Sequence, residues 1–176
     1  VGFWFFGGSG EDNLWPRPCS INQNVAARVK ENCRELTQIL GVSLLPENPA
    51  IVYVDSEITI AEFMADIGRY LDICLDIGHF WAFCKNYGLD VAKEASKLPY
   101  DAIRVIHIAG LSKVEFGGKH LYLDNHDVVP MAECLALLHH LVERCPNLGW
   151  VTYEAEMAST DVQLTGLRLI KRACGL

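Results

Sequence analysis

The sequence predicts an α/β protein, and more specifically most of a TIM-type (β/α)8 barrel. Two observations lead to this prediction. Short apolar runs alternate with amphipathic stretches of helical spacing, and the runs that begin at residues 42, 73 and 103 start about 30 residues apart, which is the rhythm of βαβ crossovers on a parallel sheet. An acidic residue or a histidine also stands near the end of each of the last four runs, and in a barrel these ends share one mouth.

The apolar runs are predicted strands, because they are short and bounded by turn residues. The first run reads as a buried strand and not as a signal peptide, since it has no basic flank and no small-residue cleavage site. Two predicted helices follow possible capping boxes, Ser20 with Gln23 and Thr59 with Glu62. We expect strands at 1–6, 42–45, 73–77, 103–108 and 150–153, and helices at 21–40, 60–71, 91–97, 131–145 and 161–174.

Five strands are fewer than the eight of a closed barrel, which typically needs about 250 residues. We therefore expect a single domain over residues 1–176 that lacks the amino-terminal βα units of the barrel. Residues 110–129 lengthen one interval and read as an inserted loop. The alternative fold is an open, doubly wound sheet, because it shares the same β-α alternation.

Composition narrows the class of protein. No apolar run approaches the roughly 20 residues of a membrane-spanning helix, so we expect a soluble protein without a membrane partner. Seven cysteines, an odd number without C-x-x-C spacing, are typical of reduced thiols in a cytoplasmic protein. A net charge of −7 disfavours nucleic acid as a partner, because few cations are left to neutralise phosphates.

Carboxylates and imidazoles gather where the predicted strands end. Two local pairs, Asp76-x-x-His79 and Asp124-x-His126, have spacings that suit metal ligation. The whole set has three imidazoles, four carboxylates and no thiolate, which suits two divalent ions such as iron, manganese or zinc bridged by carboxylate. The expected metal ligands are Glu47, Asp76, His79, His107, Asp124, His126 and Glu154. The expected catalytic residues among them are Asp76, His107 and Glu154.

Each of these residues also has a purely structural interpretation. Glu47 precedes Asn48 and Pro49 and could be a solvated turn carboxylate, and Asp76 could cap the following turn. A histidine in an apolar strand, such as His107, is usually a hydrogen-bonded core residue. The loop pair could simply lie on the surface, and for Glu156 the two interpretations are balanced. The histidines interpreted as surface or helix residues are His120, His139 and His140.

From about residue 1 to residue 157, the chain resembles the multinuclear non-haem iron-dependent oxidases. These barrel enzymes modify cysteine residues in ribosomally made peptides such as the methanobactin precursor. The most specific similarity is IHIAG at 106–110 followed by D-x-H within LDNHDVVP at 123–130. The other similar segments are DNLWPRPCS at 12–20, SLLPENPA at 43–50, CLDIGHFWAFCKNYGLD at 74–90 and TYEAE at 152–156.

The resemblance implies a centre of two or three iron ions in the barrel mouth, with zinc or manganese as alternatives. One iron would bind the substrate thiolate and dioxygen side by side. The implied partners are a cysteine-containing precursor peptide and a protein that delivers it. The family ligand or near-ligand positions correspond here to Glu47, Asp76, His107, Asp124, His126 and Glu154.

The chain departs from the family pattern at several positions. Phe3 and Leu111 stand where the family has histidine, and His79 stands where it has asparagine. His79 completes a ligand order that also resembles the endonuclease IV type of barrel, related to sugar isomerases, which would imply zinc-dependent phosphodiester hydrolysis. A third hypothesis is a degenerate barrel that only binds a peptide or a partner protein.

Overall fold

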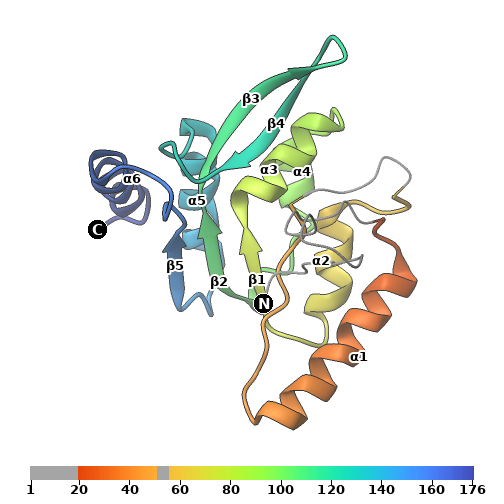
Figure 1. Ribbon diagram of the computed structural model, residues 1–176. Helices are drawn as coiled ribbons and strands as arrows, with labels where there is room; N and C mark the ends of the chain where they lie inside the picture. Colours follow the sequence, from red (N-terminus) through yellow and green to blue (C-terminus); the bar gives the residue numbers. More distant parts are fainter. Residues whose placement is uncertain (1–19, 51–55) are drawn as a thin grey trace, which may run out of the picture.

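The computed structural model of the protein describes residues 20–50 and 56–176, so the strand expected at 1–6 lies outside the described residues. The elements that form the main body are helices and parallel strands in alternation (Figure 1). Their bounds are α1 Gln23–Leu40, α2 Ile60–Gly68, β1 Ile73–Asp76, α3 Ile77–Asn86, α4 Val91–Ala95, β2 Ile103–Ile108, α5 Ala132–Arg144, β5 Trp150–Tyr153 and α6 Thr160–Ala173, with a 3-10 turn at Tyr100–Ala102. A hairpin of β3 Gly110–Phe116 and β4 Lys119–Asn125 is inserted between β2 and α5.

The sheet has the order β1-β2-β5, with all three strands parallel. On β1, Glu47 forms a further parallel bridge to Cys74. Strand neighbours that follow chain order occur both in a sector of a barrel and within one half of a doubly wound sheet. The described residues form a mixed α/β fold in which no barrel closes.

Two expected elements differ from the structure around the first described strands. The run at 42–45 was expected to be a strand, but the β-bridge in this stretch forms at Glu47, two residues later; Val42 is 56% exposed and Leu44 and Leu45 are partly buried. The strand expected at 73–77 ends at Asp76, because Asp76 caps a helix that begins at Ile77. This helix, α3, was not predicted: it is buried on nearly all sides and so lacks an amphipathic period.

The segment 110–129 was expected to be a loop, and this prediction was wrong. It forms an antiparallel hairpin, paired from Gly110 with Asn125 to Phe116 with Lys119. Its turn consists of Gly117 and Gly118, whose φ angles of 58° and 74° suit the twist of a two-residue hairpin turn. The hairpin rises from the carboxyl ends of β1 and β2 beside α3 (Figure 1).

The remaining helices agree with the sequence within a few residues at each end. Thr59 and Glu62 form the expected capping box of α2, whereas α1 is capped by Asn22 and not by Ser20. No helix in the described part of the chain is both long and apolar enough to cross a membrane.

The two faces of the sheet have opposite characters. Alternate strand residues such as Ile73, Leu75 and Ile106 are fully buried in one core together with side chains of α1, α2, α3, α5 and α6. The other face carries Asp76 and His107 in register. On this second face Asp76 is fully buried, whereas Trp150 at the start of β5 is 74% exposed.

Candidate metal centre

The expected ligands on the parallel strands meet at one end of the sheet. Asp76 is the last residue of β1 and is in register with His107, which pairs in turn with Thr152 of β5. Glu154 follows two residues after Thr152, and its backbone N–H continues the pairing by donating to the Ile108 carbonyl at 3.0 Å. Parallel pairing therefore places three successive carboxyl ends side by side.

His107 lies between two carboxylates. Its Nδ1 is 3.0 Å from Oε1 of Glu47 and 3.0 Å from Oε1 of Glu154. Hydrogen bonds with the Cys74 thiol and the two carboxylates raise the pKa of His107 to about 12, although burial acts in the opposite direction. A divalent cation and a proton compete for the same lone pairs. The carboxylates that now surround the protonated His107 ring would therefore bind a cation together with the neutral ring.

Asp76 is held rigidly and is fully buried. Its backbone N–H donates to Oδ1 of Asn48 at 2.8 Å, and the Asn48 amide donates to its carbonyl at 3.0 Å. Its Oδ1 accepts from the His79 N–H at 2.7 Å, so the capping role is confirmed. Its Oδ2 has no hydrogen-bond partner, so capping uses only half of this carboxylate. Burial raises the pKa of Asp76 to about 6, against the opposing effect of His79.

His79 projects from the first turn of α3 toward the hairpin. Its Nδ1 lies 3.1 Å from the Asn48 carbonyl, and its Nε2 lies 3.7 Å from Oδ2 of Asp124. Burial alone lowers the pKa of His79, but the carboxylates of Asp76 and Asp124 outweigh it and raise the pKa to about 10. The ring therefore joins the strand β1 carboxylate to the hairpin carboxylate.

The hairpin does reach the mouth, as the D-x-H pair suggested. His126 Nε2 lies 2.7 Å from Oδ2 of Asp124 and 3.6 Å from Oε2 of Glu154, and its Nδ1 lies 2.7 Å from Oε1 of Glu156. Burial lowers the pKa of His126, but Glu156 and Asp124 outweigh it and raise the pKa. The Asp124 Oδ1 is buried and has no partner.

A second asparagine, like Asn48, hydrogen-bonds both backbone groups of one residue and so holds the hairpin in place. The Asn86 side chain, at the end of α3, donates to the Tyr122 carbonyl at 2.8 Å and accepts from the Tyr122 N–H at 2.7 Å. The Tyr122 ring also stands edge-on against Trp81 at 4.9 Å between centroids. These contacts with α3 position Asp124 and His126.

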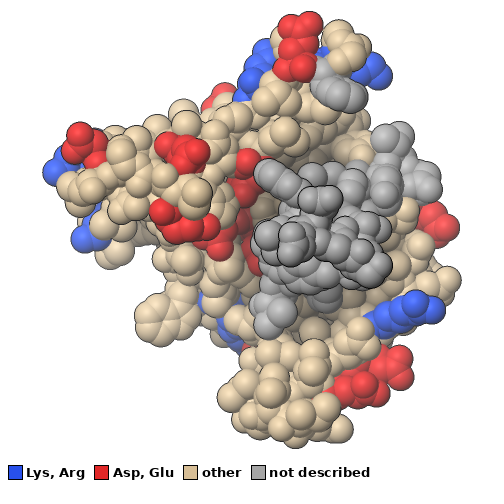
Figure 2. Space-filling model, viewed as in Figure 1, with Lys and Arg blue, Asp and Glu red and all other residues tan. Residues whose placement is uncertain are grey.

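Among the described residues, side chains that can bind a metal form three overlapping groups, each with its ligand atoms within 4.8 Å of one another. The groups are Glu47 with Cys74 and His107, Glu47 with Asp76 and His79, and Asp76 with His107 and Glu154. Figure 2 shows carboxylate side chains gathered near the carboxyl ends of the strands, with Lys and Arg placed elsewhere on this face. The three groups share residues, and their carboxylates give the site a surplus of negative charge. Both features suit the binding of more than one cation.

The structure brings all seven expected ligands together and adds three residues that sequence reasoning missed. Cys74 reads as one more apolar residue in a buried strand, although alternation places it on the same face as Asp76. Asn48 was considered only as part of a turn, and Glu156 was left undecided. Among the histidines expected elsewhere, His139 is exposed and bonds to the Ala173 carbonyl.

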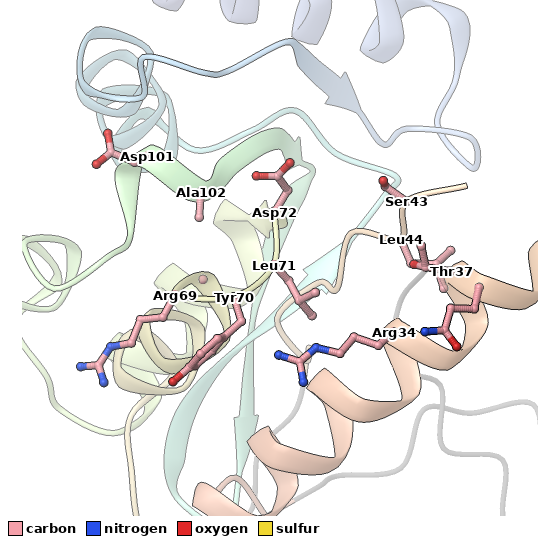
Figure 3. Close-up of a pocket in the computed structure, with 12 residues that line it drawn as sticks. Arg34, Thr37, Ser43, Leu44, Arg69, Tyr70, Leu71, Asp72, Asp101 and Ala102 are labelled. Atoms are coloured by element: carbon pink, nitrogen blue, oxygen red, sulfur yellow. The ribbon is translucent and has the colours of Figure 1, made fainter. Parts of the chain in front are cut away.

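A cavity of about 610 Å³ lies away from these groups. Figure 3 shows Arg34 of α1 pointing toward Tyr70, while Asp72 and Asp101 lie in the upper part of the view. Asp72 and Asp101 precede β1 and β2, so this cavity is at the amino ends of the strands. None of the candidate ligands lines it, and it is not the candidate site.

Comparison with known proteins finds a matching family model and several relatives. The family model described as RiPP precursor modification enzyme MbnB/TglH/ChrH matches residues 7–170, where RiPP denotes a ribosomally made and then modified peptide. Relatives named UPF0276 protein include one from Caulobacter sp. (strain K31), 28% identical over 77% of this chain and 50% of the relative. Another, from Vibrio parahaemolyticus, is 25% identical over 90% of this chain and 56% of the relative. The chain thus spans about half the length of the curated relatives it matches.

Proposed function

Since this chain belongs to the MbnB/TglH/ChrH family of RiPP precursor modification enzymes, we propose that it is an iron-dependent oxidase that uses dioxygen to modify a cysteine of a precursor peptide. The family indicates an enzyme and a peptide substrate. The iron, the oxidation and the cysteine are our proposal, and they rest on the chemistry of the side chains at the strand ends. A separate protein would deliver the peptide.

The observation that carries the proposal is a pair of buried carboxylate oxygens without hydrogen-bond partners, Asp76 Oδ2 and Asp124 Oδ1. A buried carboxylate oxygen is costly to leave unpaired, and a cation is the partner that offsets this cost. A Cβ at Gly78 would lie only 3.2 Å from Asp76 Oδ1 and 3.3 Å from Asp124 Oδ1, so glycine keeps this space open. The residues present therefore fit a bound metal.

The ligand types favour iron. Imidazole and carboxylate together suit borderline divalent ions, and a set that leaves positions open on a redox-active ion suits dioxygen chemistry. Glu47, Asp76, His79, His107, Asp124, His126 and Glu154 would hold about two or three ions. Bound iron would supply the electrons that dioxygen needs and a position for the substrate thiolate.

The chain's own residues would orient the reactants and handle protons. Asn48 holds Asp76 in one orientation through its backbone, and Asn86 holds the hairpin that carries His126. His126 Nδ1 and the Glu156 carboxylate, whose side chain is 64% exposed, form a hydrogen-bonded pair at the rim. This pair is placed to hold a proton that the substrate thiol releases.

The direct test is reconstitution. The protein, purified without air, is loaded with ferrous iron and given a cysteine-containing precursor peptide, while oxygen uptake and peptide mass are followed. We expect oxygen consumption and a mass change with this peptide, and neither with the same peptide carrying serine at each cysteine. His107→Ala should abolish both signals, and His139→Ala, far from the cluster, should retain them.

The position of His79 favours one rival, a zinc-dependent phosphodiesterase of the endonuclease IV type. In such an enzyme Asp-x-x-His would bind zinc, and here the His79 ring does face Asp124. Zinc-loaded protein that cleaves DNA at abasic sites, together with an unchanged peptide mass in the iron experiment, would replace the oxidase by this rival. Peptide binding without any bound metal would instead support a degenerate, binding-only barrel.

A further inference from the structure

Cys74 is a buried thiol inside the candidate metal centre, and none of the ligands expected from the sequence is a thiolate. It lies on β1 two residues before Asp76, so the two side chains point to the same face of the sheet. Cys74 is only 4% exposed, yet it is absent from the apolar cluster that contains its neighbours Ile73 and Leu75. The thiol therefore faces the charged side of the strand.

The neighbours of this thiol are metal-binding residue types. Glu47 is the bridge partner of Cys74 on one side, and the imidazole of His107 on β2 lies on the other. The ligand atoms of the three side chains lie within 4.8 Å of one another. A sphere of this size accommodates one ion, since metal bonds to sulfur, nitrogen and oxygen are about 2.0–2.3 Å long.

A second observation at the same place also points to a cation. Asp76, on the same face of the same strand, is fully buried and its Oδ2 has no hydrogen-bond partner. Its carboxylate belongs to a group with His107 and to another with Glu47. The Cys74 thiol is thus near a buried carboxylate with one oxygen, Oδ2, that has no hydrogen-bond partner.

We propose that the Cys74 thiolate binds one ion of the centre together with Glu47 and His107. This inference rests on the proposed function, because it assigns a ligand of that centre. On binding, the thiol proton is released to solvent and sulfur forms the bond to the metal. A soft sulfur ligand favours iron, cobalt or zinc over magnesium or manganese at this position.

The test uses Co²⁺ as a spectroscopic probe in the full chain. A cobalt ion bound by thiolate has an intense sulfur-to-metal charge-transfer absorption in the near ultraviolet, besides weaker visible bands that report any bound cobalt. We expect the near-ultraviolet absorption in the parent protein and its loss in Cys74→Ser, which keeps the size of the side chain. Cys84→Ser, at a fully buried cysteine of α3 outside the three groups, is the matched control and should retain the absorption.

Circular dichroism of both variants reports folding, and metal content is measured in the same samples. Parent protein that binds cobalt with visible bands but without the sulfur band would overturn the assignment of Cys74 and leave the metal centre intact. A band that persists in Cys74→Ser would overturn it as well. Parent protein that binds no cobalt, iron or zinc would overturn the proposed function, and this inference with it.

Discussion

Asn48 uses its side-chain amide to pair with the backbone of Asp76 as a neighbouring strand would. It accepts from the Asp76 N–H at 2.8 Å and donates to the Asp76 carbonyl at 3.0 Å, and it is only 1% exposed. The amide extends the pairing that the Glu47 bridge to Cys74 begins. The side chain of one asparagine thus fixes the residue at the centre of the candidate site.

We predict that Asn48→Ala destabilises the protein by about 1–3 kcal/mol, because two buried backbone groups lose their partners. Bound metal should also fall, since Asp76 is no longer held in one orientation. Urea denaturation and metal content measure the two effects. Asn147→Ala removes an exposed asparagine bond to the Asp101 carbonyl and should stay within about 0.5 kcal/mol of the parent. Equal losses in the two variants would argue against a special role for Asn48.

Asp76→Asn should stabilise the metal-free protein at neutral pH. The pKa of Asp76 is raised from 3.8 to about 6. Protonation of Asp76 therefore contributes fully to the free energy of unfolding below about pH 4, and this contribution is lost as pH rises through about 6. The neutral amide avoids this loss, which amounts to about 3 kcal/mol at most. Denaturation of metal-free parent and variant at pH 4 and pH 8 tests the difference, which should be small at pH 4. A variant that is less stable than the parent at pH 8 would refute the argument.

His126→Ala should lower the metal content of the purified protein, because the hairpin then contributes one ligand fewer. We expect affinity for the affected ion to fall by about 10- to 100-fold or more. His120→Ala, at an exposed position on the same hairpin, is the matched control and should bind the parent amount. Unchanged metal content in both variants would mean that the hairpin histidine is only a surface residue.

Gly110 sits where β2 passes into the hairpin, and its backbone touches the return segment. A Cβ at this position would overlap the carbonyl of Val128, and backbone atoms cannot move aside cheaply. Gly110→Ala should therefore displace the hairpin, cost about 1–3 kcal/mol and weaken metal binding. Gly149→Ala, where the added carbon would lie an ordinary 3.6 Å from the Arg104 carbonyl, should be tolerated, and thermal unfolding compares the two. Full metal binding by Gly110→Ala would argue against the hairpin as a source of ligands.

Sequence periodicity predicted the parallel strands well, because β2 and β5 are short apolar runs with clear ends. It failed for α3, whose buried residues surround the helix and leave no polar stripe to detect. The hairpin was missed although the sequence signals it, because polar and apolar residues alternate before Gly117 and Gly118, a pattern typical of two strands joined by a two-residue turn.

The candidate ligands were predictable because they are the polar residues at strand ends, where a parallel sheet collects side chains. Cys74 and Asn48 were not, for two different reasons. A cysteine within an apolar run looks like any small hydrophobic residue. The hydrogen bonds between Asn48 and Asp76 join residues that are 28 positions apart in the sequence, and no local pattern reports such a contact.

The most direct test of a multinuclear iron centre at the carboxyl ends of β1, β2 and β5 is the metal content of protein purified without air. Elemental analysis should find about two or three iron ions per chain in the parent, and less than half of that amount in Asp76→Asn and in His107→Ala. Zinc in place of iron would contradict the oxidase and support hydrolysis. Parent protein without bound metal would contradict the metal centre itself.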